Sequence, residues 1–182
     1  MKAREGGKVA TATLISLETY LTSTYEPDMD FVDGVLEDRK VGEYDHNIVQ
    51  MAILFWFHQH GREWRIRTIQ EQRTRVASSK VRIPDVCVFS RDVPIEQVFT
   101  KPQMIAIEVL SPEDRLSRID ERLNNFRSFG VPNIWAVDPQ KRSAWDCSYG
   151  NWVRKERLEV ANSPIYLSLP ELFAKIDEDN AD

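Results

Sequence analysis

The sequence predicts an α/β fold, with the α+β character of a mixed β-sheet flanked by helices. The chain of 182 residues fits a single domain, because one hydrophobic core commonly serves about 100 to 200 residues. Compact runs rich in β-branched residues at 81–89 and 104–110 are typical of strands buried on both faces. A helical pattern and a short strand at 133–137 follow the second run, and together they predict a right-handed crossover unit.

The first third of the chain predicts two helices around a hairpin. Residues 1–14 carry no periodic apolar pattern and indicate a flexible lead-in. Ser16 is a good N-cap for a short helix, and the Asp-Gly pair inside 30–36 is a strong hairpin signal. A second helix is expected over 45–60. Its run 48–57 is apolar on nearly every side, so we expect the core or an oligomer contact to cover it.

Residues 63–76 alternate between apolar and basic side chains. Trp64 and Ile66 face one way and Arg65 and Arg67 the other, as in a half-buried strand.

The C-terminal half begins with a helix signal. Ser111-Pro112-Glu113-Asp114 combines a capping serine, a proline at the first helical position and an acid, and Gly130 predicts the helix end. A hairpin over 143–157 and a helix centred on 169–176 follow. The predicted organisation is therefore a lead-in at 1–14, one folded domain at 15–176 and an acidic tail at 177–182.

The composition is that of an ordinary soluble globular protein, with 42% hydrophobic and 29% charged residues. A net charge of −5 excludes a global attraction to polyanions, so any nucleic-acid contact needs a local basic surface. Cys87 and Cys147 lie in apolar runs, and we expect them to be reduced and structural, which fits a cytoplasmic location. There is no run of about 18 apolar residues and no secretory signal, so we expect no membrane span.

Two acids, Asp85 and Glu108, interrupt the two buried runs. An isolated ionised carboxylate is costly away from water, so each acid needs a partner. One interpretation pairs each with one of the many arginines. The other brings both to a shared cation, because converging carboxylates repel one another, and hard magnesium takes a few carboxylate oxygens while keeping waters.

The spacing of Ile83-Pro84-Asp85, followed after 22 residues by Glu108-Val109-Leu110, resembles the PD-(D/E)XK nuclease superfamily. Within it, the chain is similar to the Uma-type restriction endonuclease family of bacteria. The similarity spans roughly residues 16 to 176. The segments that carry it are MDFVDGVLEDRKVGEYDHNIV, KVRIPDVCVFS, MIAIEVLSPEDRLSRIDERLNNFRSFGVPNIWAVDP and, more weakly, LSLPELF.

The resemblance implies a restriction-endonuclease-like core and a metal-dependent hydrolase that cuts DNA. Magnesium, with manganese as a substitute, would be held by Asp85, Glu108 and the backbone carbonyl of Val109. The superfamily carries a lysine two residues after the glutamate, where this chain has Leu110. In the Uma-type family a lysine on the following helix replaces it and aligns with Arg122. Guanidinium stabilises an anionic transition state but is a poor acid or base.

Three of these positions have a second interpretation. Arg122 also fits a helix-surface residue that pairs with Glu121 or Asp120. Asp30 stands where the family has a glutamate and would be a third acid near the metal, or it caps a turn. His46 aligns with a family histidine and would contact a phosphate or a metal-bound water, or it is simply solvated.

A basic stretch leads into the Asp85 strand, with seven Arg or Lys against two acids between positions 62 and 82. The same pattern also fits a solvated strand face, and no sequence-reading motif accompanies it. Lys80 is in addition an alternative to the missing catalytic lysine. The expected nucleic-acid-binding residues are Arg65, Arg67, Arg73, Arg75, Lys80 and Arg82.

Two functions follow. The first is a magnesium-dependent endodeoxyribonuclease that acts on DNA as a homodimer, because two sites are needed to cut two strands, and that uses no small-molecule cofactor. The second is a catalytically impaired nuclease-fold protein that binds nucleic acid or a protein partner. The arginine at position 122, where the family has a lysine, is the feature that supports this second function.

Overall fold

The computed structural model of the chain describes residues 14–39, 43–112 and 114–181. Within these residues the helices are α1 (Leu17–Leu21), α2 (Tyr44–Gln59), α3 (Leu116–Phe129) and α4 (Leu169–Asp179). The strands are β1 (Asp30–Val32), β2 (Val35–Glu37), β3 (Ile66–Gln70), β4 (Thr74–Ala77), β5 (Lys80–Arg82), β6 (Val86–Ser90), β7 (Ile105–Val109), β8 (Asn133–Asp138), β9 (Ser143–Asp146), β10 (Val153–Lys155), β11 (Arg157–Glu159) and β12 (Tyr166–Ser168).

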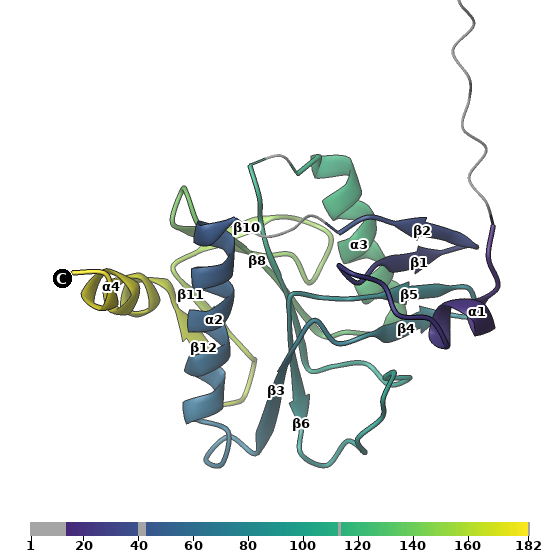
Figure 1. Cartoon of the computed structure of the whole chain (residues 1–182). Helices are drawn as coiled ribbons and strands as arrows, with labels where there is room; N and C mark the ends of the chain where they lie inside the picture. Colours follow the sequence, from purple (N-terminus) through teal and green to yellow (C-terminus); the bar gives the residue numbers. More distant parts are fainter. Residues whose placement is uncertain (1–13, 40–42, 113, 182) are drawn as a thin grey trace, which may run out of the picture.

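The core of the molecule is a six-stranded mixed sheet in the order β10-β9-β8-β7-β6-β3. Strands β7 and β8 are parallel and are joined through α3, while the other neighbours are antiparallel. Helix α2 packs against one face together with α4, and α3 packs against the other (Figure 1). The predicted mixed sheet with flanking helices and the predicted crossover unit are both confirmed.

Successive residues of β7 point to opposite faces of this sheet. Ile105, Ile107 and Val109 belong to the core that α2 and α4 cover, whereas Ala106 packs with the apolar stripe of α3. Glu108 has the parity of Ala106, so its side chain leaves the sheet toward α3.

A second sheet of four strands, β2-β1-β5-β4, lies beside the first. Its β1–β2 hairpin turns at Asp33 and Gly34, whose φ angles of 49° and 90° fit a tight hairpin turn, as the sequence predicts. Asp85, by contrast, does not lie inside one continuous strand over 81–89. The chain leaves β5 at Arg82 and enters β6 at Val86, and Pro84, which has no N–H to donate, stands at the crossing between the sheets.

Three element boundaries differ from the sequence prediction. The strand expected from residue 63 starts at Ile66, because a turn precedes it. Helix α3 begins at Leu116, and the N–H of Ser111 is bound by the Asp114 carboxylate at 2.7 Å, so this serine is not the N-cap. Helix α4 continues through Asp179. Asp177, expected in the acidic tail, lies within it and pairs with Arg142 at 2.5 Å.

Ser16 caps α1 by accepting a hydrogen bond from the backbone of Thr19, and Gly130 ends α3 with a φ of 98°, both as predicted. Cys87 and Cys147 are free and buried. Among the helices of the described residues, none combines the length and apolar character needed to cross a membrane.

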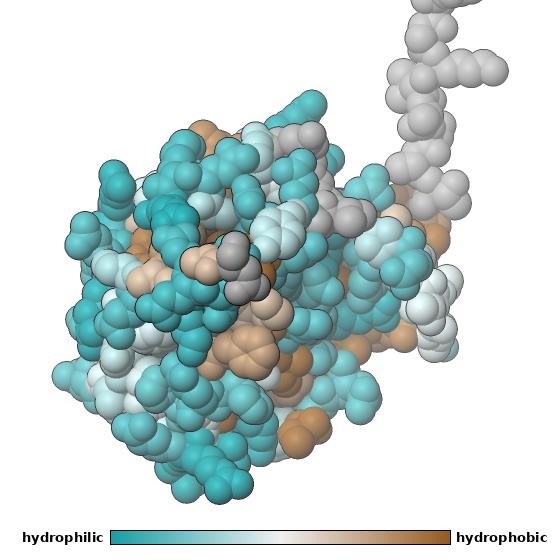
Figure 2. Space-filling view, turned by 60° about the vertical axis from the view of Figure 1, so that its left-hand side comes forward, coloured by the Kyte–Doolittle hydropathy of each residue, from teal (hydrophilic) through white to brown (hydrophobic). Residues whose placement is uncertain are grey.

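Helix α2 is apolar on both its inner and its outer side. The inner side buries Val49, Ile53 and Phe57 against the sheet. On the outer side Met51 and Phe55 are 45% and 62% exposed. They line a groove of about 330 Å³ between α2 and α4, on the flank that Figure 2 turns toward the viewer, where brown atoms interrupt a largely hydrophilic surface. The core therefore covers this helix only in part.

Candidate functional site

The acids Asp85 and Glu108 meet where β6 and β7 run side by side. Val86 pairs with Ile107 in the antiparallel ladder, so the residue before β6 comes alongside Glu108. Both acids are buried, with exposed fractions of 5% and 2%. The interruption between strands β5 and β6 at Pro84 therefore does not separate the two side chains that the sequence predicts to act together.

Asp85 is held by contacts from several elements. Its Oδ1 accepts a hydrogen bond from Arg39 Nη2 at 2.9 Å, and its Oδ2 accepts one from the backbone N–H of Val109 at 2.8 Å. The Nε2 of His46, at the start of α2, lies 3.5 Å from the same Oδ2. Burial opposes ionisation of Asp85, but the hydrogen bond from His46 and the charges of Arg122 and Arg39 hold its pKa below the ordinary value.

Glu108 has one paired and one unpaired carboxylate oxygen. Arg122, from α3, places Nη2 2.6 Å from Oε2. The Oε1 atom is buried and accepts no hydrogen bond from the described part of the chain. Burial and the nearby Asp85 carboxylate raise the pKa of Glu108 to about 8, although the positive charge of Arg122 acts in the opposite direction. A buried carboxylate oxygen without a hydrogen-bond partner is a position suited to bind an ion or a water.

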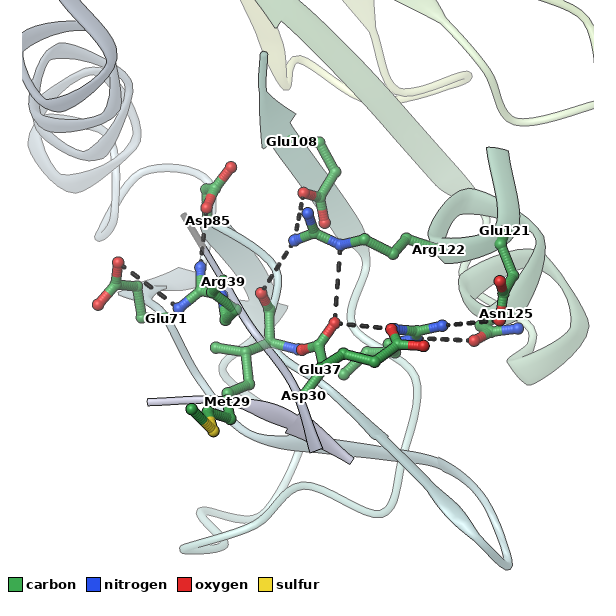
Figure 3. A network of polar contacts seen from close by, with 12 residues as sticks. Met29, Asp30, Glu37, Arg39, Glu71, Asp85, Glu108, Glu121, Arg122 and Asn125 are labelled. Carbon is green, nitrogen blue, oxygen red and sulfur yellow. Dashed lines mark hydrogen bonds and ion pairs between the residues drawn. The ribbon is translucent and has the colours of Figure 1, made fainter. Parts of the chain in front are cut away.

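Asp30 joins this network through arginines (Figure 3). Its Oδ1 accepts the backbone N–H of Ile83 at 3.0 Å, and its Oδ2 lies 2.9 Å from Arg82 Nη1 and 3.8 Å from Arg122 Nε. The structure thus connects all five predicted catalytic positions. Arg122 contacts Asp30 and Glu108, His46 contacts Asp85, and the positive charge of Arg122 acts on Asp85 and so links the two groups.

Arg82 is not a surface residue, and its assignment to a DNA-binding surface is wrong. Its side chain is 1% exposed. The guanidinium group binds Asp30, Glu37 at 2.6 Å, Glu121 at 3.0 Å and Asn125 at 2.8 Å. It ties the hairpin β1–β2 to α3, on which Arg122 stands.

Among the other basic residues of this stretch, Arg67 lies on β3 of the first sheet, and Arg75 and Lys80 lie on β4 and β5 of the second. The five that were expected to bind DNA each already have a partner within the described residues. Three of them form ion pairs: Arg65 with Asp92, Arg73 with Asp28 and Lys80 with Asp33. The other two donate to backbone carbonyls, Arg67 to those of Arg91 and Val93 and Arg75 to that of Ser78. A role for these five in DNA binding stays a prediction.

Arg39 is a residue of this site that the sequence did not reveal. It follows β2 and reaches Asp85 across 46 positions of sequence, and its side chain is 10% exposed. Its position between charged neighbours in the segment GVLEDRKVGEYD gives no signal of burial. Together with Arg122 it lines a cleft of about 440 Å³ that Arg115 and Arg118 also border.

A divalent cation at this site would need oxygen ligands from the protein. Across residues 14–39, 43–112 and 114–181, no cluster of three or more His, Cys, Asp or Glu side chains is arranged to hold a metal ion. Magnesium needs fewer, since it is usually bound by one or two carboxylates and keeps several waters. Asp85 and the open Oε1 of Glu108 meet that requirement in donor type and number.

The six-stranded mixed sheet flanked by helices is a fold of the restriction-endonuclease-like class. The chain belongs to the Uma2 family, described as "Putative restriction endonuclease", whose model matches residues 17–176. This confirms the resemblance seen in the sequence.

A solved structure shares the fold: the crystal structure at 1.96 Å resolution of "a putative nuclease belonging to DUF820" from Anabaena variabilis ATCC 29413. It superimposes with a TM-score of 0.74 at 18% sequence identity, over 88% of this chain and 98% of that chain. A search of curated proteins found no match.

Proposed function

We propose that the chain is a magnesium-dependent endonuclease that hydrolyses DNA phosphodiester bonds, with manganese as a substitute metal. The observation that carries this proposal is the buried pair Asp85 and Glu108 on adjacent strands, with an unpaired carboxylate oxygen on Glu108. Membership in a family described as a restriction endonuclease supports it.

In this proposal Asp85, Glu108 and the backbone carbonyl of Val109 hold the metal, which when bound polarises the scissile phosphate and lowers the pKa of a water. His46 and the N–H of Val109 fix the Asp85 carboxylate, so that its orientation is set before substrate arrives. Arg122 stabilises the negative charge that develops on the phosphate. It stays protonated at any relevant pH, so it orients and stabilises rather than transferring a proton.

Asp30 serves in this scheme as a positioning residue. Its carboxylate lies 3.8 Å from Arg122 Nε and is itself held by Arg82 and the backbone of Ile83. This chain of contacts aims the guanidinium group of Arg122 at Glu108.

A plasmid-nicking assay with magnesium or manganese tests the proposal. Asp85→Asn and Glu108→Gln should each reduce cleavage by more than the roughly 10- to 100-fold that loss of an outer-shell partner costs. Cleavage that survives both substitutions would place the active site elsewhere.

A second function is favoured by one observation: both carboxylates already form ion pairs with arginines, Asp85 with Arg39 and Glu108 with Arg122. Such a neutralised pair suits a nuclease-fold protein that binds nucleic acid or a protein without cutting. Tight DNA binding by the wild type, with no nicking in either metal, would favour this alternative.

For the contact with DNA, we propose that Arg65, Arg67, Arg73, Arg75 and Lys80 bind backbone phosphates. Binding would then weaken steeply with salt, because each neutralised phosphate releases counterions. Arg115 and Arg118 border the cleft and pair with no acidic side chain among the described residues, so they extend this set toward the site.

We further propose that the enzyme is a cytoplasmic homodimer. The groove between α2 and α4, with Met51 and Phe55 exposed beside it, is the apolar surface that a second copy would cover. Light scattering on the wild type and on Phe55→Glu checks this, since the charged side chain should yield monomers.

A further inference from the structure

Asp85 has two oxygens that differ in how easily they can change partner. Oδ2 accepts the backbone N–H of Val109, which is fixed within β7, and is also approached by His46. Oδ1 is bound by the guanidinium group of Arg39 at the end of a long side chain. A cation that approaches Asp85 therefore competes with Arg39 for Oδ1, while the bond to Val109 stays in place.

Arg39 has a second acceptor within reach. Its Nη1 lies 3.7 Å from Oε1 of Glu71, a half-exposed residue at the end of β3 (Figure 3). The side chain also lines the open cleft. The guanidinium group can thus leave Asp85 without losing every anionic partner, which a buried arginine with a single partner could not do.

We propose that Arg39 is a removable counter-ion of Asp85, which holds Oδ1 in the metal-free protein and moves to Glu71 and the cleft when a divalent cation binds. The inference rests on the proposed metal site and adds a competitor to it. Arg39 keeps the buried carboxylate neutralised in the absence of metal, and its displacement lowers the apparent metal affinity.

The test measures binding of Mn²⁺ alone to the full chain, without DNA, from the electron paramagnetic resonance signal of the free ion. Arg39→Met keeps the length of the side chain and removes its charge. It should bind Mn²⁺ about tenfold more tightly than the wild type, because the competing charge-assisted hydrogen bond is gone. Arg142→Met removes an arginine–aspartate pair of the surface, distant in sequence from the site, and should leave Mn²⁺ affinity unchanged.

Equal or weaker Mn²⁺ binding by Arg39→Met would overturn the inference, because a purely structural arginine loosens the site when it is removed. Asp85→Asn separates this result from a failure of the metal site. If Asp85→Asn loses Mn²⁺ binding while Arg39→Met gains nothing, the metal site stands and the role of Arg39 falls. If Asp85→Asn binds Mn²⁺ as the wild type does, both proposals fail.

Crystals of the wild type grown with and without Mn²⁺ give a second readout that does not depend on the folding of any variant. The Arg39 guanidinium should contact Asp85 only in the metal-free crystal. A contact that persists in the metal-bound crystal contradicts the exchange.

Discussion

Arg82 should be a determinant of stability, and Arg82→Met tests this. The methionine fills much of the same space but removes the guanidinium group that binds Asp30, Glu37 and Glu121. Asp30 is affected most, because its side chain is 3% exposed and would keep only the backbone N–H of Ile83 and Arg122 at 3.8 Å. Removing one partner of a buried ion pair costs about 3 to 5 kcal/mol. The contact with Glu121 adds little, because that side chain is 50% exposed.

For a chain of this size a loss of that magnitude lowers Tm by roughly 6 to 20 °C, at about 2 to 4 °C per kcal/mol. Urea unfolding at pH 7, followed by tryptophan fluorescence, gives the free energy directly. Arg65→Met is the matched control: it removes an arginine whose pair with Asp92 is more than two-thirds exposed, and it should cost about 0 to 1 kcal/mol.

Adding Asp30→Asn to Arg82→Met should restore part of the lost stability, since the unpaired buried charge is then gone. A loss below about 1 kcal/mol in Arg82→Met, together with weaker DNA binding, would refute the reasoning. It would mean that the guanidinium group is available to phosphates, as the sequence alone suggests.

Three further predictions concern the site and its support. Arg122→Met should slow magnesium-dependent nicking by roughly 100-fold or more, whereas the nicking rate of Arg122→Lys should stay within about tenfold of the wild-type rate. Equal nicking rates for Arg122→Met and the wild type would show that Arg122 has no role in catalysis. Leu123→Ala should lower the free energy of unfolding by about 2 to 5 kcal/mol, because Leu123 is 1% exposed where α3 packs on the sheet, and a urea midpoint like that of the wild type would contradict this packing. The raised pKa of Glu108 means that between its ordinary 4.5 and about 8 the folded chain binds a proton that the unfolded chain has released. Wild-type stability should therefore fall relative to Glu108→Gln as pH rises from 5 to 8, and a constant difference in urea midpoints across this range would show that the pKa is not raised.

Local sequence signals were enough for much of the fold. The Asp33-Gly34 turn, the Ser16 cap and the Gly130 helix end each depend on a short stretch whose backbone chemistry has few solutions. The crossover from β7 to β8 follows from the handedness of parallel connections. These features could be predicted because each is determined by neighbours in the chain.

The features that were missed depend on contacts between distant segments. β5 and β6 are buried in different sheets, so the apolar pattern runs through Pro84 without a gap and looks like one strand. Arg82 lies in a basic run that resembles a solvated face, and only the hairpin and α3 around it explain its burial. Arg39 likewise reaches Asp85 across 46 positions of the chain.

For the candidate site, the sequence indicated the acid pair that the structure brings together, and the resemblance indicated Asp30, His46 and Arg122. The register of β6 against β7 explains why Asp85 comes alongside Glu108. Sequence could not supply their partners, because ion pairs between side chains leave no periodic pattern.

The measurement that bears most directly on the metal site is an anomalous difference map from crystals soaked in Mn²⁺. A single strong peak is expected between Asp85 and Glu108, at about 2.0 to 2.3 Å from one carboxylate oxygen of each. Its absence at that position in crystals that contain ordered Mn²⁺ elsewhere, with Arg39 and Arg122 still bound to the two acids, would show that arginines, and not a metal, are the permanent partners of this buried pair.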